Sequence, residues 1–291
     1  MRDIDKFFER RPAGTLYHYT NVGSVVGIAK SRVIYASSAQ YLNDSSELTF
    51  GMDLLAMAIN RQADASNDSD ERVFLDDLTG WLKLYRNIPY PIFICSLSEH
   101  GSLLSQWRSY TSHGKGVSLG FSPGMISRTL ALSGCQVAKC IYDPEEQSAI
   151  VEELLSLLLT SFRNEKPERQ PIGPPDKMLY YGYIDGFRFD LFRVLAIIKD
   201  KSFEEESEWR IIYTPESKST PLSILYREGA SMLVPYVELP LGSDQQGCIF
   251  SKACLGPSRH TSLSIFALQD FLRQCGAVYE AHGCLIPYRE W

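Results

Sequence analysis

The 291-residue chain lacks the long apolar runs of membrane-spanning helices, and its charged first residues lack the apolar core of a signal peptide. Its longest apolar stretch, Leu154–Leu159, is flanked by Glu152, Glu153 and Arg163, as expected of an ordinary amphipathic helix. We therefore expect a cytoplasmic protein with no membrane partner.

The sequence also lacks the common signatures of metal sites and hydrolases. It has no Cys-x-x-Cys, no His-Glu-x-x-His and no Gly-x-Ser-x-Gly. Seven scattered cysteines form an odd number, several of them in strand-like apolar contexts. We expect buried free thiols, with Cys95 as the one candidate reactive thiol, and no metal cofactor.

The chain lacks an excess of positive charge: its formal net charge is -6 and its isoelectric point is near 5.5. The chain as a whole therefore gives no strong signal for nucleic-acid binding. Its 44% hydrophobic and 22% charged residues are typical of a folded protein with a large core.

The hydrophobic pattern predicts an α+β fold, with a mixed and mostly antiparallel sheet flanked by helices. We expect a single domain over residues 14–289, preceded by an N-terminal extension, 1–13. Strands are predicted at 15–20, 32–37, 91–97, 117–121, 137–142, 208–214, 232–239, 248–255 and 283–287. Helices are predicted at 22–30, 48–59, 103–110, 144–163, 178–198 and 260–275, with another ending near 85. Residues 63–71 read as a surface loop, and the proline-rich 164–176 as a loop or a mobile lid.

An early histidine stands in an alternating strand. Leu16, His18 and Thr20 share one face of that strand, and Tyr17 and Tyr19 share the other. A polar face here could line a cleft, although a histidine hydrogen-bonded within the core would give the same pattern.

A late glutamate differs from the acidic residues beside it. Residues 204–208 hold four carboxylates, and this cluster alone could be a solvated turn. Glu208, however, falls within the strand pattern and shares a face with Arg210. A carboxylate fixed beside an arginine stays ionised and could stabilise a cationic transition state.

Two aromatic residues lie three apart in the middle of the chain. Trp107 and Tyr110 would be neighbours on one helix face, where they could pack in the core or stack on the aromatic ring of a ligand. The following loop, 112–116, holds two glycines and Lys115, but its spacing matches neither a P-loop nor a dinucleotide fingerprint.

A polar turn at residues 42–47 precedes the second predicted helix. Asn43, Asp44 and Glu47 could cap that helix, or they could form a second polar wall of a cleft.

With these motifs the chain resembles a bacterial family catalogued as domain of unknown function 2971. The resemblance runs from about residue 14 to 289 and rests on Leu16–Thr20, Leu42–Glu47, Cys95–Glu99, Trp107 with Tyr110, Gly116–Phe121, Glu206–Arg210, Leu255–Pro257 and Ile286–Arg289. That family in turn resembles ADP-ribosyltransferases, because its histidine, aromatic and glutamate motifs follow the same order along the chain.

The resemblance implies an ADP-ribosyltransferase-like fold and a role for each motif. His18 would hydrogen-bond the adenosine ribose of NAD, with the neighbouring Tyr19 and Thr20 holding nicotinamide. Trp107 or Tyr110 would stack on the nicotinamide ring. Glu208, held beside Arg210, would bond the nicotinamide ribose and stabilise the oxocarbenium-like state as nicotinamide departs. Glu206 and Glu208 resemble the Glu-x-Glu signature of transferases that modify arginine or nucleic acid. The middle motif departs from the usual pattern, since no Ser-Thr-Ser strand start precedes it.

We therefore expect an enzyme that takes NAD as substrate and transfers ADP-ribose to an unidentified acceptor macromolecule, in the role of a toxin or phage-defence effector. Two alternatives stay open. One is a non-catalytic sensor that binds NAD or a related nucleotide. The other is a metal-dependent hydrolase or nuclease that uses Asp44, Glu47 and Glu208.

Overall fold

The computed structural model describes residues 2–42, 46–90, 92–111, 115–170, 178–217, 221–229, 231–258, 260–278 and 280–284. These residues fall into two compact units. A sheet unit comprises residues 10–37, 93–139 and 204–291, and a helical unit comprises 1–9, 38–92 and 140–203. The predicted α+β class is confirmed, and the predicted single domain over 14–289 stays a prediction.

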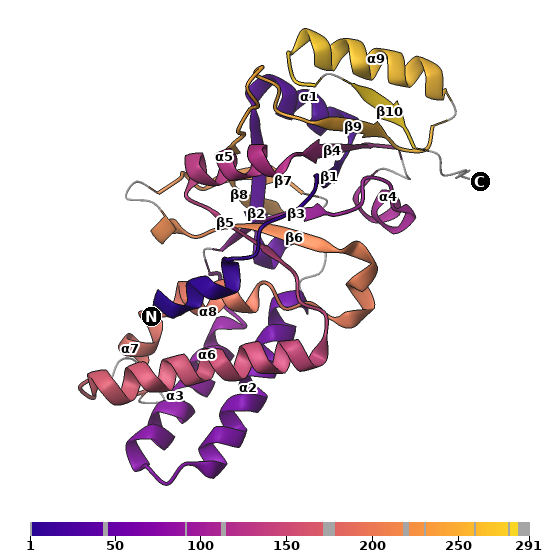
Figure 1. The fold of residues 1–291 in the computed structure, drawn as a ribbon. Coiled ribbons are helices and arrows are strands. Elements are labelled where there is room, and N and C mark those ends of the chain that lie inside the picture. The colour runs from indigo at the N-terminus through magenta and orange to yellow at the C-terminus, as the bar shows by residue number, and fades with distance from the viewer. Residues whose placement is uncertain are drawn as a thin grey trace. The chain divides into compact units, whose positions relative to one another are not determined.

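Ten strands form one mixed sheet within the described part of the chain (Figure 1). The main path runs in the order β10 (Ala281–Gly283), β9 (Lys252–Leu255), β4 (Val117–Phe121), β1 (Leu16–Thr20), β3 (Phe93–Ser98), β2 (Val33–Ser38), β8 (Leu233–Pro240) and β7 (Leu225–Glu228). β6 (Glu208–Tyr213) pairs with both β3 and β5 (Gln136–Lys139). β10 and β9 are parallel, whereas β1, β4, β6, β7 and β8 make antiparallel pairs. The predicted mixed, mostly antiparallel sheet is therefore confirmed.

One face of this sheet is the apolar core of the sheet unit. Three helices cover that face, namely α1 (Val22–Ser31), α5 (Pro123–Ser133) and α9 (Thr261–Gln274). They bury side chains such as Val25, Ile126 and Leu272 against Leu16 and Leu119 of the central strands. We call this the core face, and the opposite side the tyrosine face, because Tyr17 and Tyr19 alternate with Leu16 along β1.

Helix α5 was not predicted, although its start and end carry clear signals. Ser122 caps the helix by accepting a hydrogen bond from the backbone N–H of Met125, and Pro123 follows at the first helical position. Gly134 ends the helix with a φ of 69°, a conformation that favours glycine. The Pro-Gly pair at 123–124 resembles a turn, which hides the helix from a hydrophobic-pattern analysis.

Other elements also differ from the prediction. The predicted helix at 178–198 is two shorter helices, Tyr181–Asp185 and Arg188–Leu195, and the predicted strand at 137–142 ends at Lys139. β7 was missed because all four of its residues are exposed and show no buried alternation. β9 begins at Lys252 instead of 248, since Ile249 and Phe250 donate their backbone N–H groups to Ala277 O. β10 covers 281–283, and 285–287 of the predicted terminal strand lie outside the described residues.

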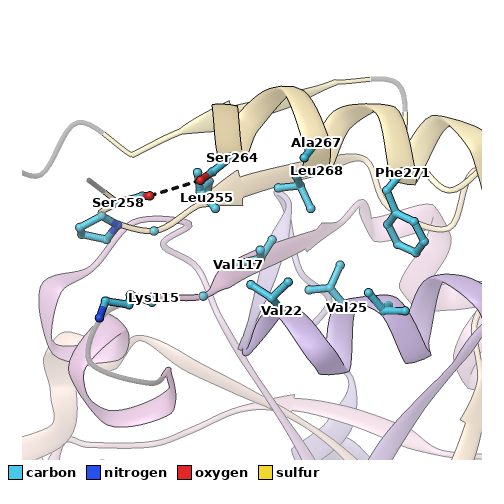
Figure 2. A pocket seen from close by; sticks show the side chains of 14 residues that line it. Val22, Val25, Lys115, Val117, Leu255, Ser258, Ser264, Ala267, Leu268 and Phe271 are labelled. Atoms are coloured by element: carbon cyan, nitrogen blue, oxygen red, sulfur yellow. Dashed lines mark hydrogen bonds between the residues drawn. The ribbon is translucent and has the colours of Figure 1, made fainter. Parts of the chain in front are cut away.

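A pocket opens in the sheet unit between α1, α9 and the paired ends of β4 and β9 (Figure 2). Its volume is about 420 Å³, and its lining is mainly apolar. Val22 and Val25 come from α1, Val117 and Leu255 from the strands, and Phe271 from α9. No predicted site residue lines this pocket.

The helical unit contains α2 (Ser46–Ala65), α3 (Ser69–Tyr85), α6 (Pro144–Glu165), α7 (Tyr181–Asp185) and α8 (Arg188–Leu195). Short 3-10 turns lie at Arg2–Phe8 and Ala39–Tyr41. A third, Lys201–Glu206, runs across the point in the chain where the helical unit ends and the sheet unit resumes, and a fourth, Pro215–Ser217, belongs to the sheet unit. Aromatic stacking joins the helices of the helical unit. The ring centroids of Phe74 of α3 and Phe162 of α6, for example, are 4.4 Å apart. The predicted loop at 63–71 is shorter in the structure, because α2 continues to Ala65 and Asp68 already caps α3.

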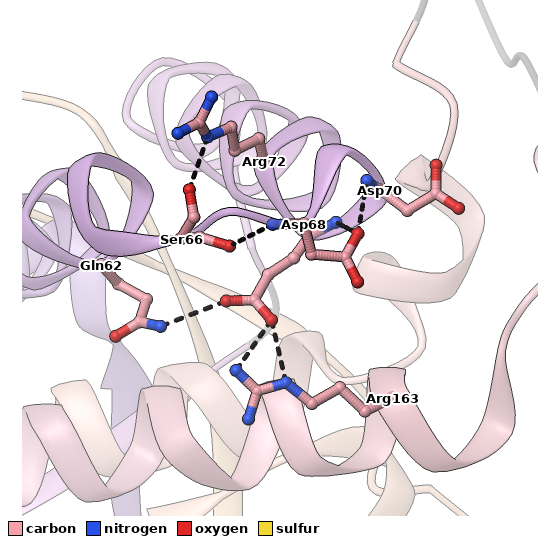
Figure 3. A network of polar contacts seen from close by, with 7 residues as sticks. Gln62, Ser66, Asp68, Asp70, Arg72 and Arg163 are labelled. Carbon is pink, nitrogen blue, oxygen red and sulfur yellow. Dashed lines mark hydrogen bonds and ion pairs between the residues drawn. The ribbon is translucent and has the colours of Figure 1, made fainter.

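A buried carboxylate ties three of these helices together (Figure 3). Glu71 of α3 accepts hydrogen bonds from Arg163 of α6 at 2.8 Å and from Gln62 of α2 at 3.1 Å. Burial raises the pKa of Glu71, but the hydrogen bonds from Arg163, Gln62 and Ser66 outweigh it, so that its pKa lies below the ordinary value.

The predicted N-terminal extension packs into the helical unit. Its 3-10 helix, Arg2–Phe8, buries Ile4 and Phe8 and contacts α8. Ile4 and Phe8 therefore belong to the core of this unit.

All seven cysteines are free, five of them are buried, and Cys275 and Cys284 are half-buried. Burial raises the pKa of Cys95 to about 12 and that of Cys254 to about 11. Thiols with such high pKa values are weakly reactive at neutral pH, which confirms the expectation of buried free thiols.

Candidate functional site

Three strands align the polar side chains of the tyrosine face. Tyr17 on β1 pairs with Ser98 on β3, and Ser98 pairs in turn with Glu208 on β6. Directly opposite residues in neighbouring strands point to the same side of a sheet. The register therefore places Tyr17, Ser98 and Glu208 in one row, with Arg210 two residues further along β6 on the same side.

Glu208 and Arg210 form a buried ion pair within this face. The Nε of Arg210 donates to Oε1 of Glu208 at 2.9 Å, and one terminal nitrogen donates to Oε2 at 3.1 Å. Their side chains are 6% and 2% exposed. Such a two-pronged contact fixes the plane of the carboxylate as well as its position.

The turn that leads into β6 is strained and held in place. Ser207 has a φ of 43°, in the left-handed region that serine seldom adopts. Ser98 Oγ donates to the backbone oxygen of Glu206 at 2.8 Å, and the N–H of Glu99 donates to the Ser207 oxygen at 3.2 Å. Strain of this kind persists where surrounding contacts enforce it, and it clusters at functional sites.

Tyr19 fastens the loop between β3 and α4 (Leu104–Tyr110) to the same face. Its hydroxyl donates to His100 O at 2.7 Å and accepts from the N–H of Leu103 at 2.9 Å. Its ring meets that of Trp107 edge-on, with centroids 4.7 Å apart. Tyr19 therefore acts as a support of the site, since its polar atom and one side of its ring are already engaged.

Helix α4 also reaches the acidic turn. Ser105 Oγ donates to Glu205 Oε1 at 3.2 Å. The first motif thus contacts the aromatic motif through Tyr19 and Trp107, and the aromatic motif contacts the glutamate motif through Ser105 and Glu205. The three motifs converge in one unit, on the tyrosine face of its sheet.

His18 is placed on the other side of the sheet from Glu208. It pairs with Leu119 of β4, alternates with Tyr17 and Tyr19, and thus points to the core face. Its Nδ1 lies 3.0 Å from Ser96 O and 4.0 Å from Cys95 Sγ. Burial lowers the pKa of His18, against a weaker opposing effect of the Ser96 contact, so that the neutral ring is favoured at neutral pH.

The two candidate stacking residues differ in exposure. Trp107 is fully buried, whereas Tyr110 is 37% exposed. Of the two, only Tyr110 therefore has ring surface that a ligand could contact. Thr20 is buried at the end of β1, opposite Val117 of β4.

The proposed second wall of the cleft falls on residues of which little is described. Asn43 and Asp44 lie outside the described residues, as does the side chain of Glu47. Ser112, His113 and Gly114 of the small-residue loop also lie outside them, and so do residues 171–177 of the predicted lid. Glu206 is half-buried beside the Ser207 turn. Within the described residues, no group of three or more His, Cys, Asp or Glu side chains is arranged to hold a metal ion.

No role is predicted for Tyr17, Ser98 or Ser207 from the sequence. Alternation along β1 already places Tyr17 on the second face of that strand, but only the register between strands shows that this is also the face of Glu208. Ser98 becomes a candidate only once its pairing with Glu208 is known, and the left-handed conformation of Ser207 has no signal in the sequence.

Comparison with known proteins finds a family model that matches part of the chain. Residues 106–211 match the model of a protein family of unknown function, DUF2971. The predicted resemblance to this family is confirmed over these residues. The matched segment runs from α4 through β6 and so includes Trp107, Tyr110, Glu206, Glu208 and Arg210. No curated protein and no solved structure matches the chain. Among the described helices, none combines the length and apolar character needed to cross a membrane.

Proposed function

We propose that the protein is a cytoplasmic ADP-ribosyltransferase-like enzyme that binds NAD on the tyrosine face and cleaves it at the nicotinamide bond. The observation that supports this most is the convergence of the three motifs on that face, through Tyr19 with Trp107 and Ser105 with Glu205. In the biological role that we propose, a toxin or phage-defence effector, ADP-ribose passes to a macromolecular acceptor.

Glu208 would supply the catalytic charge. When the bond between the ribose carbon and the nicotinamide nitrogen breaks, its electron pair leaves with nicotinamide and positive charge builds up on the ribose. A carboxylate held rigidly beside that carbon stabilises the charge until a nucleophile of the acceptor attacks. Arg210 would orient the carboxylate, and the exposed ring of Tyr110 would stack on nicotinamide.

The second candidate function is a sensor that binds NAD or a related nucleotide without turnover. Its support is the burial of Glu208, whose two carboxylate oxygens both accept hydrogen bonds from Arg210. A carboxylate engaged in this way can position a bound ligand through Arg210 without entering any reaction.

Calorimetric titration with NAD, together with an assay of nicotinamide release, distinguishes the two. For the enzyme we expect binding and release, with release abolished in Glu208→Gln. This variant should be less stable than the wild type, because Arg210 stays buried without its counter-charge, so release is compared where urea unfolding shows both proteins to be folded. Binding without release, unchanged in Glu208→Gln, would establish the sensor instead. The absence of NAD binding by the wild type would contradict both.

A second pair of variants tests which face binds the ligand. The family resemblance assigns the adenosine ribose to His18 and predicts weaker NAD binding in His18→Ala. The register places His18 on the core face, so that binding confined to the tyrosine face predicts an unchanged affinity. Tyr110→Ala should weaken binding in either case, and an unchanged affinity there would remove Tyr110 from the site.

A further inference from the structure

The register places the pocket between α1 and α9 on the opposite side of the sheet from Glu208. Val117, which lines it, pairs with Thr20 of β1, and Thr20 shares the face of His18. The pocket is therefore separate from the proposed NAD site, and an inference about it does not depend on that function.

The space has the size and shape of a small-molecule site. Its volume of about 420 Å³ falls within the range of ligand pockets, roughly 300–1,000 Å³. Protein interiors are otherwise close-packed, with few voids larger than a water molecule. Four residues of α9 at helical spacing face the pocket, namely Ser264, Ala267, Leu268 and Phe271, and Ala267 leaves room between the larger side chains.

Its polar groups gather at one end. Figure 2 shows Lys115, Ser258 and Ser264 at one end of the pocket and Phe271 at the other. The two serine hydroxyls are 3.4 Å apart. The walls between these ends are formed by apolar side chains, Val25 and Leu268 among them. A ligand that matches this arrangement has an apolar body and a single anionic head.

We propose that this pocket binds a small amphipathic carboxylate, such as a medium-chain fatty acid. The carboxylate lies within reach of the Lys115 ammonium group, with Ser258 and Ser264 as hydrogen-bond donors. The hydrocarbon chain extends past Val117 and Leu255 toward Phe271. A lysine suits this task because it is a compact charge on a flexible stem, which can follow a head group at the mouth of an open pocket.

Calorimetric titration of the full-length protein with hexanoate, octanoate and decanoate tests this proposal. Affinity should rise about fourfold with each added methylene group, from the constant of about 0.8 kcal/mol per buried CH₂. The corresponding alcohols should bind at least fivefold more weakly than the acids. If decanoate does not bind, or if chain length has no effect, the proposal is wrong.

Variants then locate the site. Ala267→Phe should fill the pocket and abolish binding, whereas Ser262→Phe, on an exposed position of the same helix outside the lining, should leave it unchanged. Lys115→Met should lower the affinity for the acids about tenfold and leave the affinity for the alcohols unchanged. Binding that survives Ala267→Phe would place the ligand elsewhere and overturn the proposal, and equal effects of Lys115→Met on acids and alcohols would refute the role of the charge.

Discussion

The described part of each unit contains a buried carboxylate paired with an arginine, but the two pairs join different parts of the chain. Glu71 and Arg163 lie 92 positions apart and join α3 to α6. Glu208 and Arg210 lie two positions apart on the same strand. An ion pair between two distant helices limits the conformations open to the whole chain. An ion pair within one strand adds little, because the strand already fixes the backbone between its two residues.

The two pairs differ in solvation as well. Arg163 is 53% exposed and keeps much of its hydration, while Arg210 is only 2% exposed. Removing both charges from water costs several kcal/mol per ion, and this cost often exceeds what their attraction returns. The Glu71 pair is therefore explained by stability alone. The Glu208 pair is not, and this difference points to a function for Glu208 and Arg210.

The largest effect should come from removing one partner of the fully buried pair. Arg210→Met leaves the Glu208 carboxylate buried without its arginine, and we expect the free energy of unfolding to fall by about 3–5 kcal/mol. Urea unfolding followed by circular dichroism measures this. A loss below about 1 kcal/mol would show that Glu208 is solvated in solution.

The double variant Glu208→Leu/Arg210→Met is the matched control. It removes both charges and replaces them with apolar side chains of similar size, so that its stability should lie within about 1 kcal/mol of the wild type or above it. If the double variant is as unstable as Arg210→Met, the pair holds the fold together and the contrast with Glu71 disappears.

Glu71→Gln should have a smaller effect than Arg210→Met. The amide loses the charge-assisted bond to Arg163 but keeps an oxygen that can accept from Gln62, and we expect a loss of about 1–2 kcal/mol. Asp70→Asn is the control, since Asp70 is its neighbour and pairs with Arg169 at a half-exposed position. Equal losses in the two variants would mean that burial of Glu71 contributes nothing.

Acid should weaken the helical unit through the same carboxylate. The folded pKa of Glu71 is lowered, so its contribution to stability is full above the ordinary pKa and is lost as the pH falls through the folded pKa. Unfolding measured between about pH 7 and about pH 3 should show a steeper decline in the wild type than in Glu71→Gln. Parallel curves would assign the acid sensitivity to other carboxylates.

The smallest effect should come from the strained turn before Glu208. Ser207→Gly relieves the left-handed φ of 43° and should raise the free energy of unfolding by up to about 1 kcal/mol. Ser207→Val should lower it, because a β-branched side chain fits this conformation poorly. A destabilised glycine variant would show that the turn is not strained.

The fold was largely predictable because its signals are local. Alternation identified β1, β4 and β6, and helical periodicity identified α2 and α6. β7 was missed because an exposed edge strand has no buried side to alternate with. α5 was missed because Pro123 and Gly124 resemble a turn, although Ser122 and Gly134 mark its two ends.

The site was predictable only in part. The sequence predicts that Glu208 and Arg210 are neighbours, since residues two apart on one strand point to the same side whatever the tertiary structure. It cannot give the register between strands, which places Tyr17 rather than His18 on the face of Glu208, with Ser98 of β3 between them. It also cannot reveal that Trp107 is covered by Tyr19 while Tyr110 stays exposed, because both positions suit the same helix face.

The most direct test of the contrast between the two pairs is NAD affinity in variants that are equally stable. Titration calorimetry would compare the wild type with Glu208→Leu/Arg210→Met, after unfolding has shown that the two have the same free energy. We predict that the wild type binds NAD and that the double variant has lost at least 100-fold in affinity, about 2.7 kcal/mol. Equal affinity in the two proteins would contradict a function for the buried pair.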